Sequence, residues 1–261
     1  MKNKSLLVLL FIVIISCNNN TASENNITNN PIQQTNIQII NQYPHNVNSF
    51  TEGLEYRDSV LYESTGLNGT SKLAKINLQT GKDITQTNLD KKYFGEGITI
   101  LNNKIYQLTY KEEKCFVYDA KTLKKLFEFS YNGEGWGMTN DGKQIINSNG
   151  SNNLYFRNIN NFNEDNIISI FDENGPLGNI NELEYVDGFI YANVWYKNYI
   201  AKIDPKQGKV VAKYDFSNII NQYLPGLHVD AVLNGIAYNA TNKTFYITGK
   251  NWPLLFEVKF N

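Results

Sequence analysis

The chain has 261 residues, with 24 Lys and Arg against 25 Asp and Glu. This balanced charge argues against a nucleic-acid-binding protein, which would need a basic surface. The two histidines and two cysteines lack metal-ligand spacing, and no clustered carboxylates surround them, so we expect no metal site and no cofactor.

The N-terminus has the pattern of an export signal. A charged start precedes an apolar run over residues 6–15 that is too short to span a bilayer. The run ends in Ile14-Ile15-Ser16-Cys17, which fits the lipobox of bacterial lipoproteins. We therefore predict a signal peptide over 1–16 and lipidation of Cys17.

The segment after Cys17 is almost purely polar up to residue 35 and has no periodicity. Such a composition cannot bury enough apolar surface to fold, so residues 17–35 are predicted to be a lipidated cysteine followed by a disordered tether. We expect the protein to be held by its lipid at a membrane of the bacterial cell envelope, facing the periplasm or the cell surface.

From residue 36 onward, short alternating strands separated by Gly, Asn and Asp recur as five repeats. The first strands of the repeats are predicted at 51–56, 95–100, 135–140, 180–185 and 233–238, and the second strands at 61–66, 105–110, 145–150, 190–195 and 245–250. A third strand follows in each repeat and a fourth in all but the last. Four strands per repeat at this period are typical of β-propeller blades.

The fifth repeat has no fourth strand of its own, whereas a well-alternating strand, NIQIINQYP (36–44), precedes the first repeat. We predict that this strand joins the last blade and closes the ring, which removes open sheet edges. Residues 36–261 are thus predicted to form an all-β, five-bladed β-propeller, expected to be a monomer.

First strands line the axis of a propeller, so equivalent positions of the five repeats should converge. These positions are Glu52, Glu96, Trp136, Asn181 and Asn234, and the ends of the second strands add Gly66, Tyr110, Gly150, Trp195 and Lys250. Polar residues around a water-filled channel, plugged by aromatics, are the alternative. Because the ring differs in every blade, the pattern favours a site.

Several motifs resemble those of the glutamine cyclotransferases: FTEGLEY, FGEGIT, GEGWGMTNDG, INELEYVDGFIYANVW, LNGIAY and ITGKNWPLLFEV. The resemblance implies a five-bladed propeller that cyclises the N-terminal glutamine of peptides or proteins to pyroglutamate and releases ammonia without a metal. A non-catalytic propeller that binds peptides, or a scaffold in the cell envelope, is the alternative. The presence of Glu96, Asn181 and Lys250 favours the enzyme.

The resemblance also implies roles for individual residues. Glu96 would be the acid/base, and Asn181 would hold the glutamine carboxamide. Lys250 would anchor substrate or help with the oxyanion, or it would instead pair with a channel carboxylate. Aromatic walls would come from Phe50, Phe94, Trp136 and Trp195, although core packing is nearly as good a role for the two phenylalanines.

Three positions depart from the family pattern, and the third of them lies in the turn after the second strand of the third repeat. Glu52 stands where Gln is usual, Tyr110 where Trp is common and Asn149 where many relatives have Asp. A second carboxylate near Glu96 should raise the pKa of at least one of the two. These changes bear on substrate preference and pH dependence, and we expect Glu52 and Tyr110 to contact substrate.

Overall fold

The computed structural model describes residues 33–34 and 36–261. The predicted signal peptide, Cys17 and nearly all of the tether therefore lie outside the described residues. Within the described part, no helix combines the length and apolar character needed to cross a membrane.

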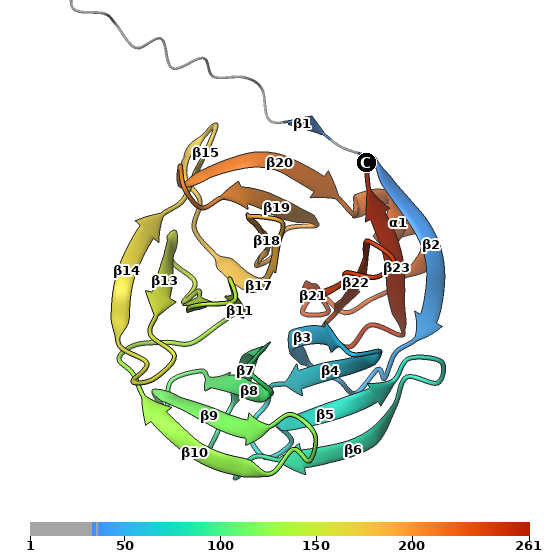
Figure 1. Ribbon diagram of the computed structural model, residues 1–261. Helices are drawn as coiled ribbons and strands as arrows, with labels where there is room; N and C mark the ends of the chain where they lie inside the picture. The colour runs from blue at the N-terminus through green and yellow to red at the C-terminus, as the bar shows by residue number, and fades with distance from the viewer. Residues whose placement is uncertain (1–32, 35) are drawn as a thin grey trace, which may run out of the picture. The chain divides into compact units, whose positions relative to one another are not determined.

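The described residues form the predicted propeller: five sheets stand around one axis, four of them with four strands and the fourth blade's with seven, because three short extra strands extend it (Figure 1). Their innermost strands are β3 (Thr51–Arg57), β7 (Gly95–Leu101), β11 (Met138–Asn140), β17 (Ile180–Val186) and β21 (Leu233–Asn239). The second strands are β4 (Val60–Thr65), β8 (Lys104–Thr109), β12 (Ile145–Asn147), β18 (Phe189–Val194) and β22 (Thr244–Gly249).

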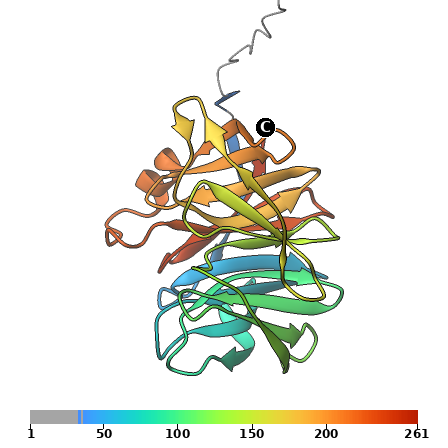
Figure 2. The same cartoon turned by 90° about the vertical axis from the view of Figure 1, so that its left-hand side faces the viewer.

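The two outer layers complete each blade. The third strands are β5 (Lys72–Asn77), β9 (Lys114–Asp119), β13 (Asn153–Arg157), β19 (Tyr199–Asp204) and β23 (Leu254–Phe260). The rim strands are β6 (Lys82–Asn88), β10 (Lys125–Ser130), β14 (Glu164–Ser169), β20 (Lys209–Asp215) and β2 (Ile37–Pro44). The apolar core lies between neighbouring blades; Leu73 of blade one, for example, packs with Ile98 and Ile105 of blade two. Figure 2 shows the same sheets from the side.

Ring closure follows the prediction. Strand β2 pairs antiparallel with β23, with Ile37 opposite Phe260 and Pro44 opposite Leu254. The first described strand after the tether therefore supplies the outer edge of the last blade, so the ring closes inside blade five; we call this pairing, together with the adjoining interface of blades five and one, the seam.

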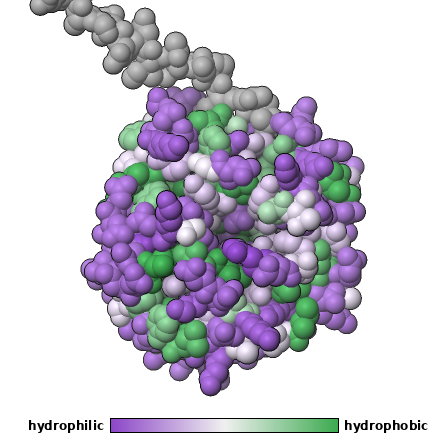
Figure 3. All heavy atoms as spheres, in the orientation of Figure 1, coloured by the Kyte–Doolittle hydropathy of each residue, from purple (hydrophilic) through white to green (hydrophobic). Residues whose placement is uncertain are grey.

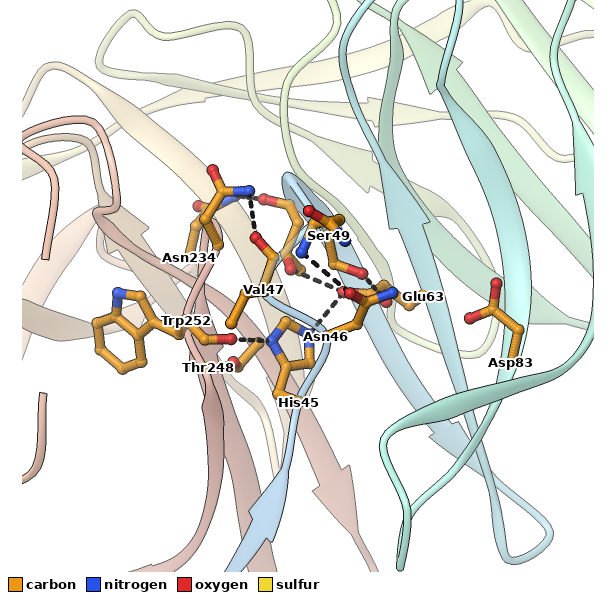
Figure 4. A network of polar contacts seen from close by, with 12 residues as sticks. His45, Asn46, Val47, Ser49, Glu63, Asp83, Asn234, Thr248 and Trp252 are labelled. Atoms are coloured by element: carbon orange, nitrogen blue, oxygen red, sulfur yellow. Dashed lines mark hydrogen bonds and ion pairs between the residues drawn. The ribbon is translucent and has the colours of Figure 1, made fainter.

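A buried polar cluster locks this seam (Figure 4). The His45 ring contacts the backbone oxygen of Trp252 through Nδ1 at 2.7 Å and Glu63 Oε1 through Nε2 at 2.9 Å. Glu63 also accepts hydrogen bonds from Ser49 Oγ at 3.0 Å and Thr51 Oγ1 at 2.7 Å. A carbonyl can only accept, and a carboxylate with two other donors is an acceptor as well. His45 is thus an imidazolium that donates from both nitrogens.

Some local predictions were wrong. Strands β11 and β12 have three residues each, although six were predicted for both. Residues 135–137 lie outside the regular ladder, although Trp136 N and Gly137 O still pair with Ser148, and the Trp136 carbonyl accepts a hydrogen bond at 2.7 Å from Gly97 N of the neighbouring blade. The sequence pattern also missed the helix α1 (Ser217–Tyr223), the hairpin of β15 (Phe171–Asp172) and β16 (Gly175–Pro176), and β1 (Gln33–Gln34), which pairs with β20.

The innermost strands share an irregularity at the predicted ring. In four of the five, the register with the second strand shifts across the ring residue: Glu52, Glu96, Asn181 or Asn234. Such β-bulges turn a side chain away from the regular alternation and are common beside active sites.

Position 97, next to Glu96, must be a glycine because the backbone of the neighbouring blade lies against it. A Cβ at this position would lie 2.6 Å from both Met138 N and Trp136 O, so no larger residue fits between blades two and three. The glycine therefore makes room for neighbouring backbone rather than for a ligand. The innermost strands approach so closely here that they narrow the channel beneath the Glu96 side chain.

Candidate active site

A cavity of about 210 Å³ lies at the end of the channel where the innermost strands begin. Its walls contain all nine residues predicted to be catalytic or to bind substrate: Phe50, Glu52, Phe94, Glu96, Tyr110, Trp136, Asn181, Trp195 and Lys250. Leu67, Tyr196 and Asp230 also line it and were not predicted. The repeat alignment thus brought together residues from all five blades.

Glu52 and Lys250 form a buried ion pair, with 2.6 Å between Glu52 Oε1 and Lys250 Nζ. The other Glu52 oxygen accepts a hydrogen bond at 3.3 Å from Asn234 Nδ2, which also donates to the Thr51 carbonyl at 2.9 Å. The Lys250 ammonium lies 4.5 Å from the centre of the Phe50 ring. Of the two alternatives for Lys250, pairing with a channel carboxylate is therefore present, and the ammonium still borders the cavity.

Glu96 is the second buried carboxyl of the cavity. Burial raises the pKa of Glu96 well above its ordinary value, the negative charge of Glu52 raises it further, and Lys250 opposes both effects only in part. The pair interacts directly, since a hydrogen bond between the two carboxyls also favours a protonated Glu96. Burial also raises the pKa of Glu52, but the contact with Lys250 opposes this, so Glu52 is the carboxyl of the pair that ionises more readily.

The Asn181 side chain has a carbonyl oxygen that is free to accept a hydrogen bond. Its Oδ1 is buried and has no hydrogen-bond partner anywhere in residues 33–34 and 36–261. The Asn181 backbone carbonyl accepts a hydrogen bond from Ser148 Oγ at 2.7 Å, which fixes the bulge that turns the side chain inward. A buried polar atom without a partner is costly, so this oxygen is suited to a polar ligand.

Aromatic rings form the remaining walls. The Phe94 ring lies edge-on to the Phe50 ring and tilted against the Tyr110 ring, with 6.3 Å and 5.7 Å between ring centres. The Trp136 ring lies edge-on to the Trp195 ring, with 5.4 Å between their centres. The Trp136 indole N–H donates to Glu134 Oε2 at 3.0 Å, which fixes the ring. Both phenylalanines therefore serve the pocket walls as well as packing against other rings.

The glycines predicted beside the ring accommodate these aromatics. A Cβ on Gly66 would lie 2.3 Å from the Phe94 ring, and one on Gly150 would lie 2.6 Å from the Trp136 ring. Small residues at the ends of two second strands therefore make room for the large residues of the adjacent first strands. The family departure at Asn149 lies outside the pocket; its amide donates to Tyr155 Oη at 3.1 Å.

The three unpredicted wall residues sit at the mouth. Leu67 and Tyr196 directly follow Gly66 and Trp195, so extending each second strand by one residue would have found them. Tyr196 Oη donates to Asp230 Oδ1 at 2.8 Å. Asp230 lies in a loop between blades four and five, for which the repeat pattern gave no equivalent. Trp252 does not line the cavity; it is fully buried and donates to the Ala231 carbonyl at 2.8 Å.

A larger cavity of about 760 Å³ opens at the other end of the innermost strands and includes Glu55 and Glu184. Burial raises the pKa of Glu55 to about 7. No group of three or more His, Cys, Asp or Glu that could hold a metal ion occurs within the described part of the chain. The surface on the face drawn in Figure 3 is mainly hydrophilic, with scattered hydrophobic residues.

Comparisons with known proteins agree with the motifs and the geometry. A family model described as glutamine cyclotransferase matches residues 8–260. The chain is 35% identical over 233 residues to a glutaminyl-peptide cyclotransferase of Arabidopsis thaliana, which covers 85% of this chain and 71% of the relative. It is also similar to the crystal structure of a Myxococcus xanthus glutaminyl cyclase, with a TM-score of 0.82 and 31% identity over 87% of this chain and 97% of that one.

Proposed function

The chain belongs to the glutamine cyclotransferase family and is an enzyme, and from this premise we propose that it converts the N-terminal glutamine of peptides or proteins to pyroglutamate. The α-amine nitrogen attacks the carboxamide carbon of the same residue, a five-membered ring closes, and the carboxamide nitrogen leaves as ammonia. The observation that carries the proposal is the position of the buried Glu96 carboxyl beside the Glu52–Lys250 ion pair in an aromatic cavity, where burial and Glu52 raise the pKa of Glu96.

Glu96 is suited to move the one proton that the reaction transfers. Its raised pKa brings it closer to neutral pH, where a carboxyl group can both accept and donate. As a carboxylate it takes the proton from the attacking amine, and as an acid it gives that proton to the leaving nitrogen. The proton count balances, and the step needs no metal or redox partner.

Asn181 and the aromatic walls supply orientation. The free Asn181 Oδ1 can accept a hydrogen bond from the N–H of the substrate carboxamide, and the Nδ2 group of the same side chain can donate to the carboxamide oxygen as negative charge develops. The cavity is smaller than the roughly 300–1,000 Å³ of pockets for drug-sized ligands, so it suits a single residue. A tight apolar sleeve favours the folded glutamine conformer in which amine and carboxamide meet.

The direct test is an assay of the purified protein with peptides of the form Gln-Xaa, following ammonia release and the loss of one ammonia mass from the peptide. Cyclisation should proceed equally with and without a chelator. Unchanged peptides at every pH tested would refute the proposed activity, and loss of turnover on chelation would refute its metal independence.

We also propose that the enzyme is a monomeric, lipid-anchored protein of the bacterial cell envelope. The sequence Ile14-Ile15-Ser16-Cys17 and the polar segment after it support this placement. Cys17→Ser should abolish incorporation of labelled fatty acid and release the protein from the membrane fraction. If the variant stays with the membrane, the anchor is elsewhere.

A further inference from the structure

Leu67 and Tyr196 stand on equivalent turns at the mouth of the cavity and share two unfavourable features. Both have left-handed backbone, with φ of 78° at Leu67 and 59° at Tyr196. Both also expose large apolar side chains, Leu67 at 43% and Tyr196 at 51%. Left-handed backbone is uncommon for bulky residues and recurs at functional sites.

The same turn in blade five provides an internal comparison. Asn251, which follows Lys250 there, also has left-handed backbone, with φ of 58°. Asparagine tolerates this conformation far better than leucine or tyrosine. Three blades therefore share this turn geometry, but only blades one and four place a large exposed apolar residue in it.

Tyr196 is held in place rather than free in solvent. Its hydroxyl donates to Asp230, and its ring lies 4.6 Å from the Trp195 ring, which in turn lies 5.4 Å from Trp136. An unbroken aromatic surface thus runs from the wall of the cavity to its rim. Leu67 lines the same cavity and continues the apolar rim from the blade-one turn.

Because the cavity accepts a single residue, the rest of a bound peptide must extend outward through the mouth. We propose that Leu67 and Tyr196 form a binding subsite for the side chain that follows the substrate glutamine, and that they make the enzyme prefer an aromatic or large aliphatic residue there. This inference rests on the proposed function, because it takes an N-terminal glutamine as the occupant of the cavity.

The test compares peptides that differ only in the second residue: Gln-Phe, Gln-Leu and Gln-Gly at equal length. For the unmodified enzyme, kcat/KM should be roughly tenfold higher for Gln-Phe and Gln-Leu than for Gln-Gly, as expected for one apolar contact. Leu67→Gly and Tyr196→Gly should each reduce this ratio, and the double variant should bring it close to one.

Leu67→Gly should also be more stable, because glycine adopts left-handed backbone without strain and the Leu67 side chain is exposed. If the side chain had only a structural role, its truncation would lower Tm. A variant whose Tm rises while its selectivity is lost therefore supports the subsite. Lys243→Gly is the matched control: Lys243 has φ of 54°, lies outside the cavity and should gain stability without any change in the Gln-Phe to Gln-Gly ratio.

Binding of the same peptides to Glu96→Gln, measured by calorimetry, separates the two proposals. Turnover without any second-residue preference would refute the subsite and leave the proposed function intact. Absence of turnover, together with tighter binding of Gln-Phe that Tyr196→Gly abolishes, would refute the function and leave the subsite intact. A preference that persists in the double variant would also refute the subsite.

Discussion

Glu52 and Lys250 are 198 positions apart in the chain, and their side chains meet at 2.6 Å across the seam of the ring. Both are almost fully buried, so each charge depends on the other for compensation. The pair has two roles: it links blades one and five, and its charges act on the neighbouring Glu96 carboxyl.

Lys250→Met should therefore affect stability and activity together. The change leaves Glu52 charged and buried without its cation, which typically costs about 3–5 kcal/mol of unfolding free energy. Denaturant titration measures this loss. In the double variant Glu52→Gln/Lys250→Met, the free energy of unfolding should largely recover while turnover stays low. If turnover recovers with stability, Lys250 has only a structural role.

Glu52→Gln should move the pH profile instead of abolishing activity. The negative charge of Glu52 raises the pKa of Glu96, so its removal lowers that pKa, and Lys250 then faces Glu96 with no competing carboxylate. The limb on which Glu96 loses its proton should shift to lower pH in plots of kcat/KM against pH. A shift toward higher pH would contradict the assigned coupling.

Glu96→Gln should lose about 10²- to 10⁴-fold in kcat, the range for removal of a general acid–base group. The amide keeps nearly the same shape, so the variant should fold and still bind substrate. Glu55→Gln is a matched control, because Glu55 is another buried carboxyl on an innermost strand but borders the opposite cavity. Near-normal turnover of Glu96→Gln would place the proton shuttle elsewhere.

The pair of His45 and Glu63 should give stability a bell-shaped dependence on pH. Burial acts to lower the pKa of His45, but the Glu63 charge and hydrogen bonds to Glu63 and the Trp252 carbonyl outweigh it and raise that pKa. Burial acts to raise the pKa of Glu63, but His45 and the two hydroxyl donors outweigh it and lower that pKa.

The directions of the His45 and Glu63 pKa shifts determine where stability is lost on the alkaline and acidic sides of the pH curve. The contribution of His45 is full below its unfolded pKa and is lost as pH rises through the raised folded value. The contribution of Glu63 is full above its unfolded pKa and is lost as pH falls through the depressed folded value. Tm measured against pH should thus fall on both sides, and His45→Gln should flatten the alkaline limb. An unchanged alkaline limb would show that another group causes it.

Gly97→Ala should destabilise the ring, because its Cβ would overlap the backbone of blade three. Such overpacking commonly costs about 1–3 kcal/mol and would displace the adjoining Glu96. Gly178→Ala provides the control, since a Cβ there meets nothing within 4 Å. Thermal unfolding and kcat of the two variants should differ clearly. Equal behaviour would mean that the backbone at Gly97 adjusts freely.

The sequence allowed the ring and its site to be predicted because both follow from periodicity. Equivalent first-strand positions must converge on the axis once the repeat length is known, and Glu96, Asn181 and Trp136 did so. Their convergence needed no knowledge of individual contacts.

The features that could not be predicted depend on contacts between particular residues, which the repeat period does not indicate. The bulges that turn Glu52 and Asn181 inward arise from backbone pairing between strands. The left-handed turn at Tyr196 and its bond to Asp230 depend on two loops 34 residues apart. The short β11 reflects the approach of Gly97, which belongs to another blade.

The seam also has a consequence for how the protein reaches its working state. Strand β2 pairs with β23, and Glu52 meets Lys250, only after the ends of a chain of more than two hundred residues come together. Contacts this distant in sequence form late, because loop-closure entropy opposes them until the intervening blades are compact. Blades can thus acquire their strands while the catalytic charges are still apart. During refolding, recovery of enzyme activity should lag behind recovery of β-structure by the time that ring closure takes.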